Sequence, residues 1–273
     1  MDEHPEPVRA AGGGLDRRAE VGAFLRTRRA RLAPKDVGLP TYGRRRVPGL
    51  RREELALLAG VSVAYYTRLE QGDGGNVSAQ ILDSIARALR LSDDEHAHLT
   101  HLAKPKPGRK EPAAPARQVR PALQHLLDSF DGVPAYVVGR RTDILAWNRM
   151  AAAVFGDWAQ LSARERNWSR LVFLRPECRD LYVDWEQKAS DVVGFLRMDA
   201  GCHPEDPQLS ALVSELSMRS AQFRRLWAAH DVKAKGCGTR DLRHPLVGEL
   251  TLSFETFGLA DAGEQALITH HAE

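Results

Sequence analysis

Residues 50–72 read LRREELALLAGVSVAYYTRLEQG, and this stretch decides how the first part of the chain folds. The pattern predicts two short helices joined by a tight turn. Leu55, Leu58 and Ala59 have the i, i+3, i+4 spacing that places side chains on one face of a helix. Gly60 suits the turn because glycine adopts a positive φ angle at little cost. We therefore expect a first helix that buries one apolar face and ends at this glycine.

The second helix of the pair has its own start and stop signals. Ser62 can cap it, because a serine hydroxyl accepts a hydrogen bond from a free backbone N–H at a helix start. Gly72 suits its end, where glycine is commonly found. Two helices joined by a glycine-containing turn form the geometry that places the second helix in the major groove of DNA. The stretch is therefore expected to be a helix-turn-helix.

The second helix would supply the contacts to bases, and basic residues near the first helix would bind the DNA backbone. Arg52 suits a phosphate because it combines a positive charge with a helix N-terminus. The arginines at 44–46 are expected to grip phosphates or to enter a minor groove, although a solvated arm would have the same composition. The expected DNA contacts are Arg44, Arg45, Arg46, Arg51, Arg52, Ser62, Val63, Ala64, Tyr65, Thr67 and Arg68.

Some positions on the second helix allow more than one interpretation. Arg68 could contact a base or form a local ion pair with Glu70. Of Tyr65 and Tyr66, one ring is expected to pack inward, which leaves the other hydroxyl to reach a phosphate. Val63 is apolar, so it offers contact with a thymine methyl group instead of a hydrogen bond.

The net charge of +3 conceals an asymmetry along the chain. Residues 1–110 hold 20 Lys and Arg against 14 Asp and Glu, whereas residues 111–273 hold 19 against 22. The excess is largest in residues 17–52, with 12 basic and two acidic side chains. Because this segment adjoins the helix-turn-helix, binding to DNA phosphates explains it better than a merely solvated surface.

Composition divides the 273 residues into two domains. Residues 1–14 are acidic and rich in Pro and Gly, so we expect a disordered tail and not a signal peptide. Residues 15–103 predict five helices around one core. Residues 104–121 hold five prolines and are expected to be an extended linker, which leaves residues 122–273 as the second domain.

Two features of composition bear on where the protein acts. No apolar run approaches the roughly 20 residues that are needed to cross a bilayer. The three cysteines are widely spaced and odd in number, which does not suggest a disulfide framework. We expect a cytoplasmic protein that does not enter the membrane.

The second domain is expected to contain two strands, several helices and then three strands. AYVVG at 135–139 and DILAW at 143–147 predict the first pair of strands. Three more strands are expected at about 234–241, 247–257 and 265–270. This is the chain order of an α+β, PAS-like domain, in which a five-stranded antiparallel sheet cups a cavity against helices. The helical patterns between the strands lie near 148–156, 168–174, 180–200, 207–217 and 219–229.

Motifs in both domains occur in an order that is typical of one family. They are GLRREELALLAGVS followed by YYTRLEQG in the first domain, and PAYVVGRRTDILAWN, RNWSRLVF, RDLYVDWE, and FRRLWAAHDV with HPLVGELTL in the second. The set resembles the MmyB-like transcriptional regulators over nearly the whole chain past residue 15, and the first domain resembles the Cro/repressor type of helix-turn-helix. The resemblance implies a PAS-type ligand sensor in the second domain, with a fatty acid as the ligand class.

The same resemblance implies a cavity among the large apolar side chains of the second domain, although core packing is the alternative for each of them. A carboxylate in that cavity would need hydrogen-bond donors, for which Asn148, Arg170 and His230 are the candidates. The expected ligand contacts are Asn148, Phe155, Arg170, Leu171, Phe173, Trp185, Leu196, Leu216, Phe223, Trp227, His230 and Leu252.

The pair His230 and Asp231 together with His244 allows a catalytic or metal site as one interpretation. The sequence has no Gly-Xaa-Ser-Xaa-Gly elbow, no Walker loop, no dinucleotide fingerprint and no HExxH motif. We therefore expect no enzyme, no metal and no cofactor beyond the fatty-acid-like ligand.

The sequence thus predicts a bacterial one-component transcriptional regulator with an all-α helix-turn-helix domain followed by an α+β PAS-like domain. It would bind double-stranded operator DNA as a homodimer, since one small domain recognises few base pairs, and it would sense a small apolar ligand. Two alternatives remain open: the second domain serves only dimerisation, or it is a small-molecule enzyme tethered to DNA.

Overall fold

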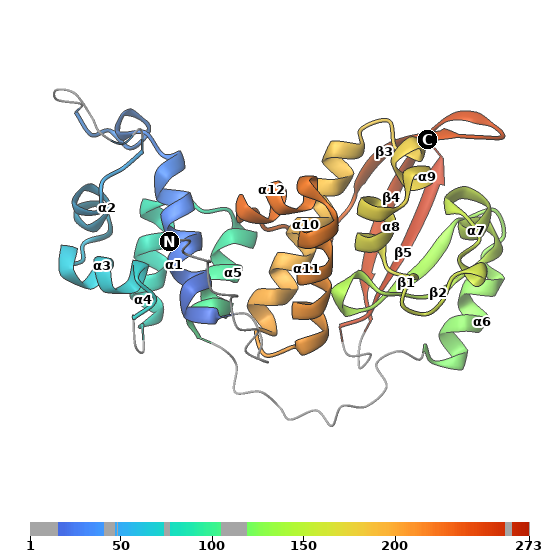
Figure 1. Ribbon diagram of the computed structural model, residues 1–273, viewed down its shortest axis with the longest axis horizontal. Coiled ribbons are helices and arrows are strands. Elements are labelled where there is room, and N and C mark those ends of the chain that lie inside the picture. The colour runs from blue at the N-terminus through green and yellow to red at the C-terminus, as the bar shows by residue number, and fades with distance from the viewer. Residues whose placement is uncertain are drawn as a thin grey trace, which may run out of the picture.

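The computed structural model of the chain describes residues 16–40, 47, 49–73, 77–104, 119–259 and 264–272. They form a helical N-terminal domain and an α+β C-terminal domain that lie side by side (Figure 1). The N-terminal domain consists of α1 (Arg17–Arg31), a 3₁₀ turn (Pro34–Val37), α2 (Arg52–Ala59), α3 (Val63–Glu70), α4 (Ala79–Ala88) and α5 (Asp93–Ala103).

The predicted helix-turn-helix is formed by α2, the turn after it and α3. Gly60 has a φ angle of 66°, the left-handed conformation expected at the turn. Ser62 caps α3, because its hydroxyl accepts a hydrogen bond of 3.1 Å from the backbone N–H three residues on. The predicted buried face of α2 is wrong at Leu58, which is 37 % exposed. Leu55 and Ala59 are buried as predicted, and Ala56 is buried as well, because α2 packs against both α3 and α4.

The remaining N-terminal helices complete one apolar core. Ser78 caps α4, and Ser92 with Glu95 forms the reciprocal hydrogen bonds of a capping box at the start of α5. Side chains from α1, α2 and α4 are fully buried between the helices, among them Phe24 and Ile85. The domain therefore needs only helix–helix contacts for its core.

The C-terminal domain consists of α6 (Pro121–Ser129), β1 (Ala135–Val138), a 3₁₀ turn (Arg140–Thr142), β2 (Ile144–Trp147), α7 (Arg149–Phe155), a 3₁₀ turn (Trp158–Gln160), α8 (Trp168–Leu174), α9 (Pro176–Leu181), α10 (Trp185–Cys202), α11 (Pro207–Arg219), α12 (Ala221–Ala228), β3 (Gly238–His244), β4 (Gly248–Gly258) and β5 (Ala266–Ala272). The strands form one five-stranded antiparallel sheet in the order β2-β1-β5-β4-β3. Two strands, a series of helices and three strands follow one another along the chain, as predicted.

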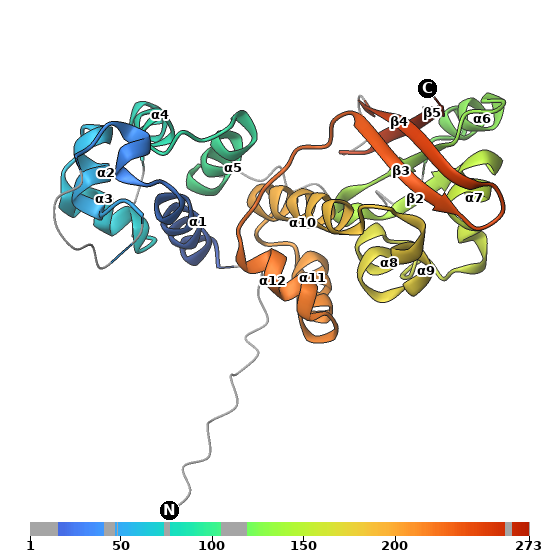
Figure 2. The same cartoon turned by 90° about the horizontal axis from the view of Figure 1, so that it is seen from above.

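Helices cover both faces of the sheet at β1. Tyr136 and Val138 pack in a core with side chains of α7, α8 and α10, whereas Ala135 and Val137 pack against α6. Figure 2 shows α6 on one side of the sheet and α8 to α11 on the other. All four residues of β1 are therefore buried, while β3 and β4 leave many side chains exposed.

Two predicted boundaries in this domain are corrected by the structure. The pattern at 180–200 contains parts of two helices, because Asp184 accepts a hydrogen bond of 2.9 Å from the backbone N–H of Gln187 and so starts α10. The strand expected at 234–241 begins only at Gly238, because several residues before it contact the N-terminal domain.

The two domains contact each other through α1 and α5 on one side and α10 with residues 229–236 on the other. Both views show α1 and α5 next to α10 and α12 (Figures 1 and 2). Helices α2 and α3 lie on the outer side of the N-terminal domain (Figure 1). The contact between the domains therefore leaves the helix-turn-helix uncovered.

Candidate DNA-binding surface and ligand pocket

Helix α3 presents most of its predicted contact residues to solvent. Val63 is 47 % exposed, and Ser62, Ala64 and Arg68 are exposed as well, while Thr67 is half-buried. An arginine can bond guanine through two hydrogen bonds, and small apolar side chains can contact the thymine methyl group. Because the C-terminal domain does not cover this surface, it is open to a DNA groove (Figure 1).

The two neighbouring tyrosines of α3 differ in burial. Tyr66 is fully buried in the core of the domain, whereas Tyr65 is half-buried at the edge of the exposed face. Arg51 is exposed, and its guanidinium lies 3.5 Å from the carboxylate of Glu53. The predicted basic arm at 44–46 lies outside the described residues.

A buried ion-pair network fixes α3 against α1 and α2. The Glu70 carboxylate accepts two hydrogen bonds from Arg29, of 2.8 and 2.9 Å, and another of 3.0 Å from Arg52. Burial acts to raise the pKa of Glu70, but the hydrogen bonds and charges of the two arginines outweigh it and lower the pKa below its usual value. Glu70 thus pairs with these two arginines and not with Arg68. Arg52 keeps 45 % of its side chain exposed, so part of it still faces solvent beside α3.

A narrow cavity of about 50 Å³ lies between the sheet and α10. Most of its lining is apolar, which is the usual character of a small-molecule site. The lining residues are Tyr136, Val138, Thr142, Trp168, Val192, Phe195, Lys235, Gly236, Phe254, Thr256, Ile268 and His270.

Two of these lining residues carry polar groups of interest. His270 Nδ1 is buried and has no hydrogen-bond partner among the described residues. Burial, with the charge of Lys188 in addition, lowers the pKa of His270 to about 3, so its imidazole is neutral. Lys235 Nζ donates a hydrogen bond of 3.2 Å to the carbonyl of Gly139, and burial lowers the pKa of Lys235 below its usual value. An ammonium and an imidazole at an apolar cavity can hold the polar end of a ligand.

The predicted ligand contacts do not line this cavity. Asn148 caps α7 by accepting a hydrogen bond of 2.9 Å from Ala151 N, and His230 Nδ1 lies 3.0 Å from Arg197 Nη1 near the N-terminal domain. The apolar candidates pack in two core clusters of the domain, which agrees with the alternative that they are ordinary core residues. They are Phe155, Leu171, Phe173, Trp185, Leu196, Leu216, Phe223, Trp227 and Leu252.

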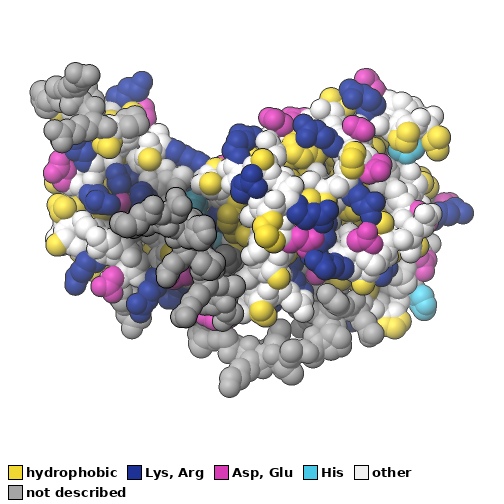
Figure 3. Space-filling view, in the orientation of Figure 1, with side chains coloured by type: hydrophobic (Ala, Val, Ile, Leu, Met, Phe, Trp, Pro, Cys, Tyr) yellow, Lys and Arg dark blue, Asp and Glu magenta, His cyan; other side chains and the backbone are white. Residues whose placement is uncertain are grey.

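Arg170 and Leu171 line a different hollow, of about 500 Å³, on the surface between α8 and α11. Arg170 and Arg164 both donate hydrogen bonds to Glu215, of 2.8 and 2.9 Å. The hydrogen bond from Arg170, with help from Arg164, lowers the pKa of Glu215 to about 2. Figure 3 shows basic and acidic side chains close together on this face. Arg175 pairs with Glu165 there, and Arg219 pairs with Glu215.

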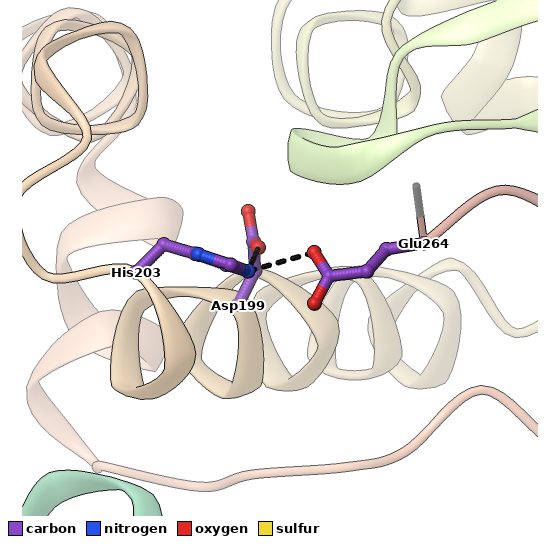
Figure 4. Close-up of side chains that lie close together, drawn as sticks. All are labelled: Asp199, His203 and Glu264. Atoms are coloured by element: carbon purple, nitrogen blue, oxygen red, sulfur yellow. Dashed lines mark hydrogen bonds and ion pairs between the residues drawn. The ribbon is translucent and has the colours of Figure 1, made fainter. Parts of the chain in front are cut away.

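A cluster beside α10 has the composition of a metal site but is occupied by an arginine. Asp199, His203 and Glu264 bring their ligand atoms within 4.8 Å of one another (Figure 4). Arg140 Nε lies 3.2 Å from the carboxylate of Asp199 and 3.4 Å from that of Glu264. Because this guanidinium already pairs with both carboxylates, a cation would have to displace it.

Val192, Phe195, Lys235 and His270 are cavity residues that the sequence did not single out. Only His270 could have been recognised from the sequence. In the strand ALITHHA, His270 stands two residues after Ile268, and alternate residues of a strand face the same side of a sheet. That alternation places an imidazole on the apolar face, where a polar group needs an explanation. No comparable signal marks the other three, because their spacing is that of ordinary core residues.

A helix-turn-helix with an open recognition helix, joined to a separate α+β domain with an apolar cavity, defines a DNA-binding transcription regulator with a ligand-binding domain. Residues 119–273 match the family model of the MmyB-like transcription regulator ligand binding domain, and residues 20–99 match that of a helix-turn-helix domain. The chain therefore belongs to the MmyB-like transcription regulators. No curated protein matches it. Across the described parts of the chain, no helix combines the length and apolar character needed to cross a bilayer.

Proposed function

We propose that this regulator acts in the cytoplasm, binds operator DNA as a homodimer, and takes up a fatty-acid-like ligand in the cavity beneath α10. One observation carries the ligand proposal: an apolar cavity is lined by Lys235 and by His270, whose Nδ1 has no hydrogen-bond partner among the described residues. An acyl chain would bury its methylene groups in the cavity, and its carboxylate would pair with the lysine.

The cavity must widen before it can hold such a ligand. Small-molecule sites usually enclose about 300–1,000 Å³, whereas this cavity measures about 50 Å³. Each methylene that becomes buried contributes about 0.8 kcal/mol, which can offset the displacement of lining side chains. We therefore expect affinity to rise with chain length until the cavity is full.

The test is a calorimetric titration of the full chain with saturated fatty acids of increasing length and with the corresponding alcohols. Acids are expected to bind more tightly than alcohols of the same length, because only they pair with Lys235. In a Lys235→Met variant this preference should disappear while the dependence on chain length remains. Equal affinity of acids and alcohols for the unmodified chain would contradict the assigned carboxylate partner.

The homodimer proposal rests on the size of the recognition surface. One helix-turn-helix reads few base pairs, and two of them related by a twofold axis read a palindromic operator. Sedimentation equilibrium should therefore give a mass of about twice 30.3 kDa at concentrations that saturate DNA. A dimer that binds none of the acids or alcohols would favour the alternative in which the C-terminal domain only dimerises.

A further inference from the structure

Helix α10 is shared by the ligand cavity and the interface between the domains. Val192 and Phe195 line the cavity. Arg197, two residues further along the helix, donates a hydrogen bond of 2.6 Å to Glu20 on α1, and its guanidinium is almost completely buried. Gly201, at the next turn, packs against His98 on α5. A single rigid helix therefore contacts both the cavity and the N-terminal domain.

Residues 229–236, which lie between α12 and β3, are shared in the same way. Asp231 accepts hydrogen bonds from two α1 arginines, of 3.0 Å from Arg28 and 2.5 Å from Arg31. Val232 packs against the apolar core of the N-terminal domain. The backbone N–H of Ala234 donates a hydrogen bond of 2.8 Å to Asp94 on α5. This connecting segment thus contacts the N-terminal domain through Asp231, Val232 and Ala234.

The next two residues of the connecting segment, Lys235 and Gly236, line the cavity. The segment also lies directly on α10, because a Cβ atom built on Gly194 would be 2.8 Å from the Cβ of Lys233. Lys233 Nζ in turn donates a hydrogen bond of 2.7 Å to Asp191 on the same helix. Figure 2 shows the chain running from α12 past α10 to β3.

The connecting segment is the part of the cavity wall that can move most easily. Strands and helices of the wall are held by repeated backbone hydrogen bonds, whereas residues 231–236 of the segment make no backbone–backbone hydrogen bond to another described residue. A cavity of about 50 Å³ must widen to admit an acyl chain. Displacement of Lys235 and Gly236 would pull on Asp231, Val232 and Ala234 a few residues away.

We propose that residues 229–236 couple ligand binding to the docking of the N-terminal domain, so that a ligand in the cavity loosens the contacts of Asp231, Val232 and Ala234 with α1 and α5. This inference rests on the proposed ligand site and adds the route by which that site reaches the DNA-binding domain. The contact between the domains leaves α2 and α3 uncovered, so the ligand does not change the exposure of the recognition helix. It changes how freely the N-terminal domain can reorient. Coupling of this kind is reciprocal, so weaker contacts between the domains must raise the affinity for the ligand.

The experiment compares the full chain with an Asp231→Asn variant, which removes the charge held by Arg28 and Arg31. The probe is dodecanoate, measured by calorimetric titration, and docking is followed by hydrogen–deuterium exchange of α1 and α5 peptides. We expect the variant to bind dodecanoate at least about fivefold more tightly, at the lower end of the usual range for coupled sites. We also expect saturating dodecanoate to increase exchange in α1 and α5 of the unmodified chain.

Asp180→Asn is the matched control, because Asp180 is an exposed aspartate on α9 outside the interface. It should leave both dodecanoate affinity and exchange unchanged. Equal or weaker dodecanoate binding by Asp231→Asn, or unchanged exchange in α1 and α5 at saturation, would overturn the proposed coupling while leaving the ligand site intact. A chain that binds neither dodecanoate nor its longer homologues would overturn the ligand site and the coupling together.

Discussion

Gly201 on α10 and His98 on α5 are in such close contact that a Cβ atom built on the glycine would lie 2.5 Å from His98 Nδ1. Both residues are buried, and the His98 ring also packs edge-on against Phe24 of the N-terminal core at a centroid distance of 5.2 Å. The two domains therefore meet at a close-packed point, not only through charged side chains at the surface.

Gly201→Ala should weaken this contact. Alanine favours a helix over glycine by about 1 kcal/mol, but overpacking of a close-packed site costs about 1–3 kcal/mol. Since His98 cannot move without disturbing Phe24, the overlap should dominate and destabilise the protein by about 1–2 kcal/mol. Urea unfolding of the full chain measures the effect.

Gly258→Ala provides the control for this substitution. A Cβ atom at Gly258 would meet no atom of the described residues within 4 Å, so the change should be nearly neutral. If Gly201→Ala were as stable as Gly258→Ala, the close contact between α10 and α5 would be contradicted.

The second prediction concerns the buried Glu70, which holds the recognition helix α3 against α1 and α2. Glu70→Ala would leave Arg29 and Arg52 without their shared carboxylate, at a cost of about 2–3 kcal/mol for hydrogen bonds to a charged group. The orientation of α3 should also suffer, so DNA affinity should fall at temperatures where the domain is still folded. Unfolding in urea and fluorescence anisotropy with labelled DNA measure the two effects.

Glu53→Ala is the matched control for Glu70→Ala. The Glu53 side chain is 64 % exposed and lies 3.5 Å from Arg51, and exposed ion pairs contribute only about 0–1 kcal/mol. Equal losses of stability in the two variants would show that the buried network does not hold α3 in place.

Three buried histidines predict how stability depends on pH. Burial first, and nearby positive charges second, lower the pKa of His98, His230 and His270 to about 3 each. The folded protein therefore keeps them neutral, while the unfolded chain binds protons below a pKa of about 6.5. Their stability contribution is complete above pH 6.5 and is lost as the pH falls from there towards 3.

The free energy of unfolding should accordingly fall between pH 7.5 and pH 5.5, by about 1 kcal/mol for each histidine at the lower pH. The arginines lower the pKa values of Glu70 and Asp231, so protonation of these two carboxylates affects stability only below about pH 4.5. It does not change the free energy of unfolding between pH 7.5 and pH 5.5. A His98→Leu variant should show a flatter profile. An unchanged unfolding free energy across the window would mean that the three imidazoles are not buried in the neutral form.

The exposed face of α3 predicts the effect of one charge on DNA binding. Arg68→Ala should weaken binding by about 1–3 kcal/mol if the guanidinium contacts a guanine, and should relax the preference for that base pair. DNA selected from a random pool by the unmodified chain supplies the ligand for anisotropy titrations. Arg87→Ala on α4 is the control, because Arg87 is exposed but lies on another helix. Equal affinities of the two variants would exclude Arg68 from the interface.

Local structure in the N-terminal domain could be predicted from sequence because its signals are local. The caps Ser62, Ser78 and Ser92 each act on a backbone N–H three residues away, and all three are observed. The turn at Gly60 was likewise predictable, because it depends on the positive φ angle of that one residue. The sequence of strands and helices along the C-terminal domain was also predictable, since alternation of apolar and polar residues marks each strand separately.

The ligand cavity could not be predicted in the same way. Val192 and Phe195 have the spacing of core residues on α10, and only the packing of sheet against helix decides that they border a cavity. The domain interface is even harder to predict from the sequence, because Arg28 and Arg197 pair with residues that are 203 and 177 positions away along the chain. A proline-rich linker predicts domains that are separate in sequence, and it contains no information on whether they dock.

Control of DNA binding by the ligand is tested most directly by the affinity of the full chain for its selected DNA, measured with and without saturating dodecanoate at constant salt. We expect the affinity to change by at least about fivefold, as is typical for coupling between two sites. Dodecanoate that saturates the protein in calorimetry and leaves DNA affinity unchanged would contradict this expectation.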